Sequence, residues 1–206
     1  MFHNKAIITL AKYFVYIVRK NQQMAKLAKT YLQITIPIII LIISVSELYS
    51  NNRILIGIDL FPSFLASDQN IHNKIGEDKQ LHIVIAYQYD QNTAIDMANR
   101  LKDLGKIRGI PIKVYISTEN EIEYSKDQNI AGIFIAESMI PLRSIIKKSI
   151  EQSFIVFSPF EGDVEKGVTG GMYITDRIVP YINVKTLLLA KINMKSFFFK
   201  VSKQYE

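Results

Sequence analysis

The sequence contains no cysteine, and it has only three histidines, His3, His72 and His82, among its 206 residues. The absence of cysteine excludes a disulfide scaffold, a cysteine-ligated zinc site, an iron–sulfur cluster and a thiol nucleophile. Three scattered histidines are too few for a histidine-rich metal site. We therefore expect neither a metal nor a cofactor.

Sequence motifs of the common catalytic classes are also missing. No GxGxxG follows the first apolar strand, where the loop reads Gln88 to Asn92, and no P-loop, GxSxG or HExxH occurs. Response-regulator receivers carry an acidic pair after the first strand, but here that position is Ala86-Tyr87. His82 lies inside an apolar run and is predicted to be structural, and His72 is predicted to lie at the surface. We expect the protein not to be an enzyme.

The net charge of +6 is confined to the N-terminus. Residues 1–33 hold six basic side chains and no acidic one, whereas residues from Asn51 onward hold 19 basic and 18 acidic side chains. Nucleic-acid binding needs a basic face on the folded domain. A nearly neutral domain gives no electrostatic reason to expect a nucleic-acid partner.

Residues 34–46 form an almost entirely apolar run directly after the basic segment. As a helix this run rises about 20 Å, which is less than the roughly 30 Å of hydrocarbon in a bilayer. Its length suits the apolar region of a signal peptide, and Ser44 and Ser46 form a small-x-small cleavage pattern. An uncleaved anchor over roughly residues 31–48 and a buried core helix are the alternatives.

This segment sets the expected domain organisation. Residues 1–50 are predicted to be an export signal or inner-membrane anchor, with the true start at Met24 as an option, and residues 51–206 a single domain. The positive-inside bias keeps the basic end in the cytoplasm. The domain is therefore expected in the periplasm, with membrane contact only through the N-terminal segment.

Apolar periodicity in the rest of the chain predicts alternating strands and helices. Strands are expected over 81–87, 110–117, 130–136, 154–157, 168–175 and 178–182, and helices over 54–66, 91–104, 138–151, 184–191 and 196–204. This order is typical of an α/β three-layer sandwich with a mostly parallel sheet of about six strands and an antiparallel edge.

Several local features refine this prediction. Pro62 is expected to kink or restart the first helix near Phe61. Ser138 and Asn183 are candidate helix N-caps. Residues 68–80 are polar and are the expected linker.

Polar side chains follow three of the predicted parallel strands. Because ligands bind beyond the carboxyl ends of such strands, these side chains are candidates for binding a small polar ligand or a partner. They are Tyr87, Gln88, Asp90, Glu137, Ser158, Phe160 and Glu161, with ordinary loop composition as the alternative.

The loop 158–171 places three carboxylates at alternate positions, Glu161, Asp163 and Glu165. Such spacing suits a hard cation, but the rest of an EF-hand pattern is missing, so a solvated or partner-facing loop is the favoured interpretation. Asp163 is therefore included among the partner-binding candidates.

Three consecutive phenylalanines near the C-terminus cannot all face one side of a helix. One or two are expected to pack on the sheet. Phe198, Phe199 and Tyr205 are candidates for a dimer or partner interface.

Four short motifs occur in a distinctive order in the C-terminal part of the chain: Phe157-Ser158, Gly170-Gly171-Met172, Val179-Pro180-Tyr181-Ile182-Asn183 and Lys195-Ser196-Phe197-Phe198. This order resembles the YfiR-like family of periplasmic proteins. Upstream, an export signal, a helix with an aromatic-Pro step and two apolar strands continue the resemblance, which covers roughly residues 54–206.

The resemblance implies a similar α/β domain, often dimeric. The best-known type represses an inner-membrane diguanylate cyclase by binding its periplasmic part, and thereby controls cyclic-di-GMP output and biofilm formation. That type uses cysteines as a redox element, which this chain lacks.

We therefore expect an exported, non-enzymatic regulatory domain that binds an inner-membrane signalling protein of the diguanylate cyclase or sensor kinase type. The alternative is a periplasmic small-ligand-binding protein that uses the crevice at the strand carboxyl ends.

Overall fold

A computed structural model describes residues 12, 16, 33–39, 41, 52–119 and 129–206. The chain forms two compact units, Met1–Ser50 and Asn51–Glu206. In the first unit, residues 33–39 are helical and exposed. Within the described residues, no helix has both the length and the apolar character needed to cross a membrane.

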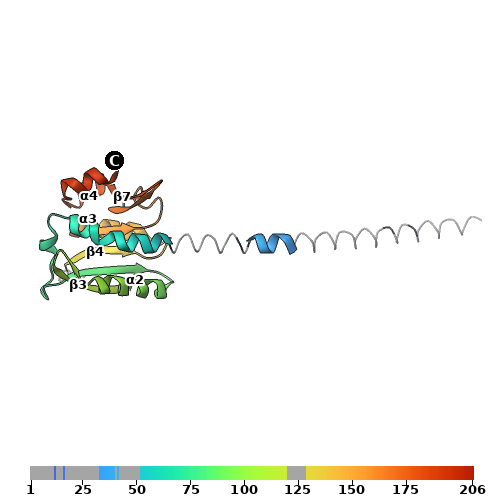
Figure 1. The fold of residues 1–206 in the computed structure, drawn as a ribbon, viewed down its shortest axis with the longest axis horizontal. Coiled ribbons are helices and arrows are strands. Elements are labelled where there is room, and N and C mark those ends of the chain that lie inside the picture. The colour runs from blue at the N-terminus through green and yellow to red at the C-terminus, as the bar shows by residue number, and fades with distance from the viewer. Residues whose placement is uncertain (1–11, 13–15, 17–32, 40, 42–51, 120–128) are drawn as a thin grey trace, which may run out of the picture. The chain divides into compact units, whose positions relative to one another are not determined.

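The second unit is an α/β domain built on an eight-stranded sheet with the order β2-β3-β1-β4-β5-β6-β7-β8 (Figure 1). Strands β3, β1, β4, β5 and β6 are parallel, and β2 and β7 pair antiparallel with β3 and β6. The strands are β1 Leu81–Tyr87, β2 Lys106–Ile107, β3 Ile110–Thr118, β4 Ile130–Ile135, β5 Ile155–Ser158, β6 Gly170–Ile174, β7 Ile178–Asn183 and β8 Lys203–Tyr205.

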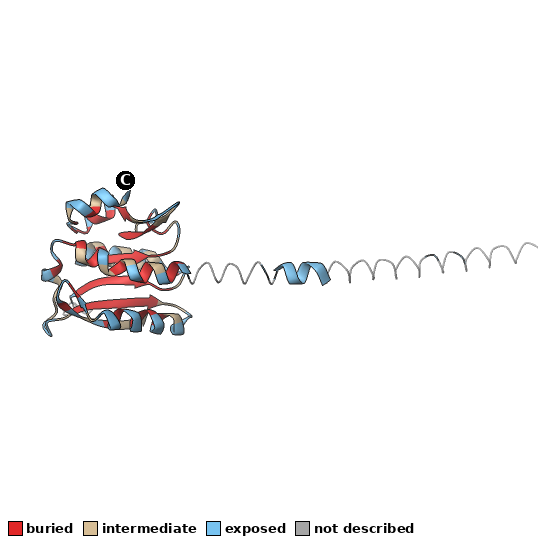
Figure 2. Ribbon diagram, viewed as in Figure 1, coloured by how far each residue is buried: buried red, intermediate tan, exposed pale blue. Residues whose placement is uncertain are grey.

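Helices cover both faces of this sheet. They comprise a helix over residues 52–67, η1 Ile71–Lys74, α2 Gln91–Leu104, α3 Leu142–Gln152, α4 Val184–Leu189 and α5 Ser196–Val201. The helix of residues 52–67, α2 and the C-terminal helices share one apolar core, and α3 packs in a second core on the other face. Figure 2 shows the strands buried between helices whose outer sides are exposed, which confirms the predicted three-layer α/β domain.

The chain leaves β1 and β4 in opposite directions. From β1 it passes through α2 to β3 on one side, and from β4 it passes through α3 to β5 on the other side. Neighbouring parallel strands whose connections diverge form a topological switch point, where doubly wound proteins bind ligands. The loops after β1 and β4 are therefore where a crevice is expected.

An aromatic cluster fixes the helix of residues 52–67 to the sheet. Phe61 lies 5.7 Å from Phe134 and 5.6 Å from Phe157 between ring centroids. Gly132 of β4 permits this close approach, because a Cβ atom there would lie 2.7 Å from the Leu65 side chain. The glycine inside an otherwise Ile-rich strand thus has a packing reason.

Several local predictions are confirmed. Helix α2 spans Gln91–Leu104 and ends at Gly105, whose φ of 72° is the left-handed conformation that suits glycine. Strands β6 and β7 form an antiparallel hairpin, with Ile174 paired to Ile178, which agrees with the expected antiparallel pairing. Asn183 caps α4 by accepting a hydrogen bond from the Thr186 N–H at 2.8 Å.

Other local predictions are wrong. The helix of residues 52–67 is continuous through Pro62, so the restart that was one of the two expectations there does not occur. Ser138 is not an N-cap, because α3 begins at Leu142 and its N-cap residue is Pro141, which lacks a capping side chain. The expected linker 68–80 includes η1 and is tied to the domain by a β-bridge between Asp68 and Met194.

The C-terminus also differs from the prediction. The last helix ends at Val201 rather than at Gln204. Residues Lys203–Tyr205 then add β8 parallel to β7, and the short β2 adds a strand at the other edge. These two short strands extend the sheet from the expected six or so to eight.

Candidate functional site

The switch-point crevice is bridged by a side chain of the protein itself. Glu137 follows β4, and its Oε2 accepts hydrogen bonds from the backbone N–H groups of Gln88, Tyr89 and Asp90, at 2.9, 2.8 and 3.1 Å. Consecutive N–H groups that converge in this way form an anion-binding nest, and they precede the N-terminus of α2, where the helix dipole also favours a negative charge. Glu137 therefore occupies the position that a ligand anion takes in other doubly wound proteins.

The environment of Glu137 favours its ionised form. Burial alone raises the pKa of the carboxyl group, but the three backbone hydrogen bonds together outweigh that effect and lower the pKa below its ordinary value. The carboxylate is thus held as a permanent internal anion at neutral pH.

The other predicted residues of the β1–α2 loop serve the local fold. Tyr87 is half-buried and packs against the core that contains α2. Asp90 caps α2: its Oδ1 accepts from the Thr93 N–H at 3.0 Å and its Oδ2 from the Thr93 hydroxyl at 2.6 Å, and these bonds lower its pKa. The Gln88 side chain donates to the Tyr89 hydroxyl at 3.2 Å. Structural hydrogen bonding therefore accounts for much of this polar cluster.

A second buried polar cluster follows β5. Ser158 is fully buried and donates from its hydroxyl to Oδ2 of Asp163 at 2.7 Å, while it accepts from the Phe160 N–H at 3.2 Å. Lys166 completes the cluster by donating to Oδ1 of Asp163 at 3.0 Å. These contacts fold the β5–β6 loop back on the end of its strand and fix where Phe160 lies.

The three carboxylates of this loop do not converge. Asp163 is buried and held by Ser158 and Lys166, whereas Glu161 is exposed. Glu165 accepts from the Tyr181 hydroxyl at 3.1 Å, in a different direction. Among the described residues, no group of three or more acidic or histidine side chains is placed to hold a metal ion.

Beside this cluster lies an open groove with a volume of about 700 Å³. One wall comes from the β4–α3 loop and the first turns of α3, and the other from the β5–β6 loop. It is lined by Ser138, Met139, Ile140, Leu142, Arg143, Ile146, Phe160, Glu161, Asp163 and Lys166. Phe160 and Glu161, predicted from the strand ends, and Asp163, predicted from the acidic loop, thus meet at one cavity, and Glu137 immediately precedes its first lining residue.

The residues of the α3 wall of the groove were not predicted from the sequence. Met139 and Arg143 are exposed, and Met139 adopts a φ of 70°. Arg143 and Ile146 are spaced by three, as on one face of α3, whereas Met139 lies in the turn before that helix. This spacing can be seen in the sequence and indicates a shared helix face. Taken alone, however, Arg143 resembles any exposed basic residue.

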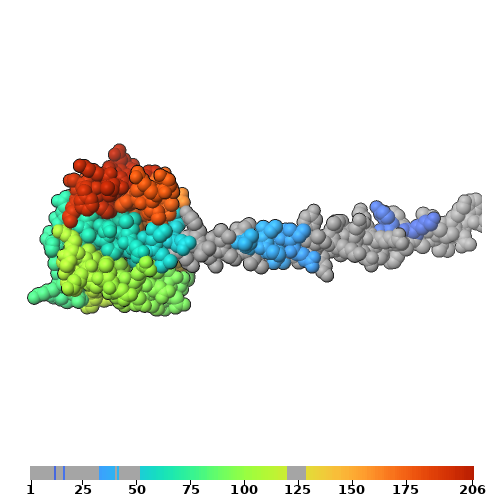
Figure 3. Space-filling model, viewed as in Figure 1, coloured from blue at the N-terminus to red at the C-terminus, as the bar shows by residue number. Residues whose placement is uncertain are grey.

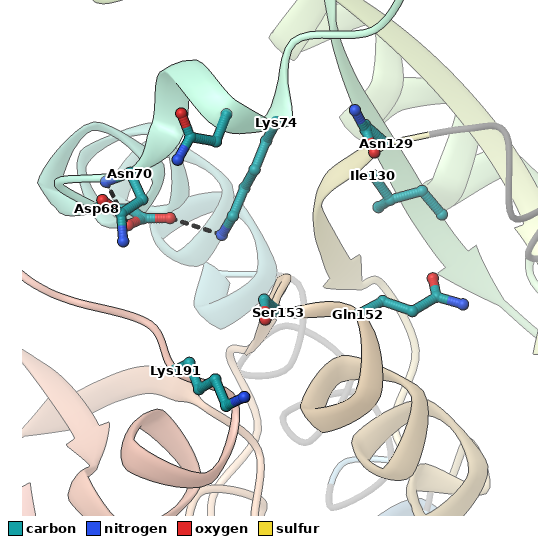
Figure 4. A pocket seen from close by; sticks show the side chains of 9 residues that line it. Asp68, Asn70, Lys74, Asn129, Ile130, Gln152, Ser153 and Lys191 are labelled. Atoms are coloured by element: carbon teal, nitrogen blue, oxygen red, sulfur yellow. Dashed lines mark hydrogen bonds and ion pairs between the residues drawn. The ribbon is translucent and has the colours of Figure 1, made fainter.

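A second, polar cavity of about 400 Å³ lies at the opposite edge, near the start of β4 (Figure 4). Asp68 and Lys74 form an ion pair at 2.5 Å on one wall, and both side chains are largely buried. Carboxamide and hydroxyl side chains line much of the rest, with Lys191 at one side. The remaining lining residues are Asn70, Asn73, Asn129, Ile130, Gln152 and Ser153.

The Asp68–Lys74 pair is a structural feature of this cavity. Oδ1 of Asp68 accepts from the Asn70 N–H at 2.9 Å, which closes the turn before η1. Burial lowers the pKa of Lys74, and the opposing attraction of Asp68 only partly offsets this. The ammonium and Oδ2 make no directed hydrogen bond to another described group, so the two charges depend on each other.

The predicted interface residues divide between core and surface. Phe198 is buried at 3% exposure and packs edge-on against Phe64 at 4.9 Å, so its assignment to an interface is wrong. Phe199 is partly buried against the same core. Tyr205 is partly exposed in β8, and the phenylalanine that faces solvent is Phe197, at 58% exposure.

The two histidines of the domain lie as predicted. His82 is buried, and its Nε2 contacts both carboxylate oxygens of Asp78 at 2.9 and 3.0 Å. His72 is exposed.

Comparisons with known proteins give distant structural neighbours. No family model matches the chain, and no curated protein matches it. Among solved structures it is similar to an ABC domain in complex with L-Trp from Streptococcus pneumonia, with a TM-score of 0.46 and 10% identity over 68% of this chain. The chain spans 59% of that solved chain. At this identity and TM-score the likeness supports no conclusion about a ligand or a function of this chain.

Proposed function

We propose that this protein is a non-enzymatic binding domain and that its ligand occupies the groove between α3 and the β5–β6 loop. The observation that supports this proposal is the convergence of Phe160, Glu161 and Asp163 at a cavity of about 700 Å³. Cavities of this size accommodate small ligands in other proteins. The groove also lies at the carboxyl edge of the parallel strands, the edge at which this class of fold binds ligands.

The polar groups beside the groove favour recognition over chemistry. Glu137 and Asp90 accept hydrogen bonds from the protein's own backbone, and Ser158 is fully buried against Asp163. Groups held in this way position loops. The exposed lining residues are then left to select a ligand by shape, apolar contact and charge.

A thermal-shift screen of small molecules against the full-length chain tests this function. A ligand that binds the folded state raises its melting temperature. Ile146→Glu, in the groove, should abolish that rise, and Ile95→Glu, on the partly exposed face of α2, should preserve it. A ligand whose effect survives Ile146→Glu would place binding elsewhere and contradict the proposal.

A second candidate function is regulation of an inner-membrane signalling protein by direct contact. The observation that favours this second function is the exposure of four apolar side chains in the C-terminal segment. Figure 3 shows this segment at the opposite end of the domain from α2. They are Leu188, Leu189, Phe197 and Val201, at 73%, 52%, 58% and 55% exposure. Exposed apolar residues of this kind suit a protein interface.

In this second proposal the domain lies in the periplasm, and the basic and apolar N-terminal segment supports that location. Its partner is a membrane protein of the diguanylate cyclase or sensor kinase type, as the resemblance to the YfiR-like family implies. Capture of detergent-solubilised membrane proteins by the full-length chain tests the proposal. Leu188→Lys should abolish recovery of a signalling protein, whereas Leu104→Lys, at an exposed residue of α2, should not. Equal recovery by both variants would contradict the proposal.

A further inference from the structure

The groove contains four charged side chains, of which two neutralise each other. Asp163 is buried and pairs with Lys166 at 3.0 Å, so both charges already have a partner within the protein. The other two are Arg143 and Glu161, both exposed. Within the described residues, neither makes an ion pair or a hydrogen bond.

The rest of the lining is largely apolar. Ile140 is buried at 4% exposure, and Leu142, Ile146 and Phe160 are partly buried around the same core. Met139 stands at the margin with 94% of its surface exposed, although it is a large apolar residue. Methionine is flexible and polarisable, and it adapts to irregular apolar ligands. The groove therefore combines an apolar wall with one uncommitted guanidinium.

Resting on the binding function proposed above, we propose that the groove binds a small carboxylate with an apolar body. The guanidinium of Arg143 receives the carboxylate, because a planar fork of N–H donors matches the two oxygens of that group. The apolar body lies on the wall formed by Ile146, Phe160 and Met139. Two sources share this chemistry, a simple organic acid and an amino acid with an apolar side chain.

Glu161 distinguishes these two sources. It is the second unpaired charge of the groove, and its carboxylate suits the α-ammonium of an amino acid. A simple organic acid has no positively charged group that could pair with Glu161. Removal of this charge should therefore weaken the binding of an amino acid, and it should not weaken the binding of the corresponding acid, whose carboxylate Glu161 repels.

The test uses four probes with the same phenyl body: 3-phenylpropionate, L-phenylalanine, 3-phenylpropanamide and phenethylamine. Binding to the full-length chain is followed by the NMR signal of the Met139 methyl group, assigned by a Met139→Leu variant. At least one of the two carboxylates should shift this signal, and the amide and the amine should shift it far less. Glu161→Gln then separates the acid from the amino acid.

Arg143→Gln should weaken carboxylate binding by about 10-fold or more, the loss expected for a charge-assisted hydrogen bond. Lys147→Gln is the matched control, because it removes the same charge one turn further along α3, outside the groove lining.

Equal binding to Arg143→Gln and to the unaltered chain would overturn the role of Arg143. Preferential binding of the amide or the amine would overturn the carboxylate specificity but leave the groove as a binding site. If no probe shifts the methyl signal at concentrations up to roughly 1 mM, the inference is overturned. The proposed function would still stand if another ligand bound the unaltered chain and Ile146→Glu abolished that binding.

Discussion

Oε2 of Glu137 accepts a hydrogen bond from the backbone N–H of Tyr89 at 2.8 Å, and this contact joins the loops that follow β4 and β1. It lies at the switch point of the sheet, where the chain turns to opposite faces. The carboxylate therefore closes, from within, the crevice in which an anionic ligand would bind the backbone of the β1–α2 loop. The open groove lies next to this closed crevice, on the α3 side.

Glu137→Ala should destabilise the domain and create an anion site. Three backbone N–H groups lose their acceptor, and a cost of about 1–3 kcal/mol is expected for unsatisfied donors. Urea denaturation measures the loss, and added acetate should restore part of it. Glu161→Ala, which removes an exposed carboxylate, should be near neutral and insensitive to acetate. Failure of acetate to stabilise Glu137→Ala selectively would contradict the anion-nest interpretation.

The contribution of Glu137 should also depend on pH. Its pKa in the folded state is lowered, because the backbone hydrogen bonds outweigh the effect of burial. A lowered pKa stabilises the fold at pH values above the pKa of the unfolded chain, and this contribution is lost as the pH falls through the folded-state pKa. The stability difference between the unaltered chain and Glu137→Gln should therefore shrink on acidification. A difference that is constant from neutral to acidic pH would show that ionisation is irrelevant.

Phe198→Ala and Phe197→Ala should differ strongly, although the residues are adjacent. Phe198 is buried at 3% exposure against Phe64, so its truncation should cost about 3–5 kcal/mol through lost burial and a cavity. Phe197 is 58% exposed, and its truncation should change stability by less than about 0.5 kcal/mol. Chemical denaturation of both variants checks this, and similar losses would mean that the orientation of α5 is wrong.

Lys74→Met should destabilise the domain more than replacement of both members of the Asp68–Lys74 pair. Removal of one buried partner leaves an uncompensated charge, at a cost of about 3–5 kcal/mol. In Lys74→Met combined with Asp68→Asn no buried charge is left alone, so part of the loss should be recovered. A double-mutant cycle on unfolding free energies measures the coupling. Additive losses would show that the two charges are independent.

Tyr181 should ionise at a higher pH than an ordinary tyrosine. Burial, followed by the hydrogen bond to Glu165, raises its pKa to about 12. A raised folded-state pKa stabilises the fold below the ordinary tyrosine pKa, and this contribution is lost as the pH rises toward the folded-state value. Ultraviolet titration of the unaltered chain should show a late component that is absent in Tyr181→Phe. An unchanged titration curve in that variant would contradict the assignment.

Much of the fold could be predicted because the signals are local. The apolar runs that form β1 and β4 identify buried parallel strands, and the helical spacing ahead of Gly105 identifies α2 with its end. The Asn183 cap and the β6–β7 hairpin also follow from residues close in sequence. The short β2 and β8 could not be found in this way, since a strand of two or three residues has no periodicity and exists only through its neighbour.

The candidate site was predicted only in part, for a similar reason. The positions after the predicted strands identified Phe160 and Glu161, and the acidic pattern of the loop 158–171 identified Asp163; all three line the groove. The sequence could not show that Glu137 is already hydrogen-bonded to the backbone of the β1–α2 loop, 47–49 residues away. Glu137 therefore could not be distinguished from a carboxylate that is free to bind a ligand. The sequence also could not identify Arg143 as a binding residue. Whether an exposed basic side chain has a partner depends on contacts between segments that are distant in the sequence.

The sequence by itself determined the α/β class, the confinement of the charge excess to the first 33 residues and the absence of cysteine chemistry, since these depend on composition and local periodicity. Only the tertiary structure decided which polar groups remain available for binding. Glu137 is satisfied by Gln88, Tyr89 and Asp90, and Asp163 by Ser158 and Lys166, while Arg143 and Glu161 face an apolar groove without partners in the described chain. The physical reason is that a side chain is available only when no distant part of the fold already satisfies its hydrogen bonds and charge.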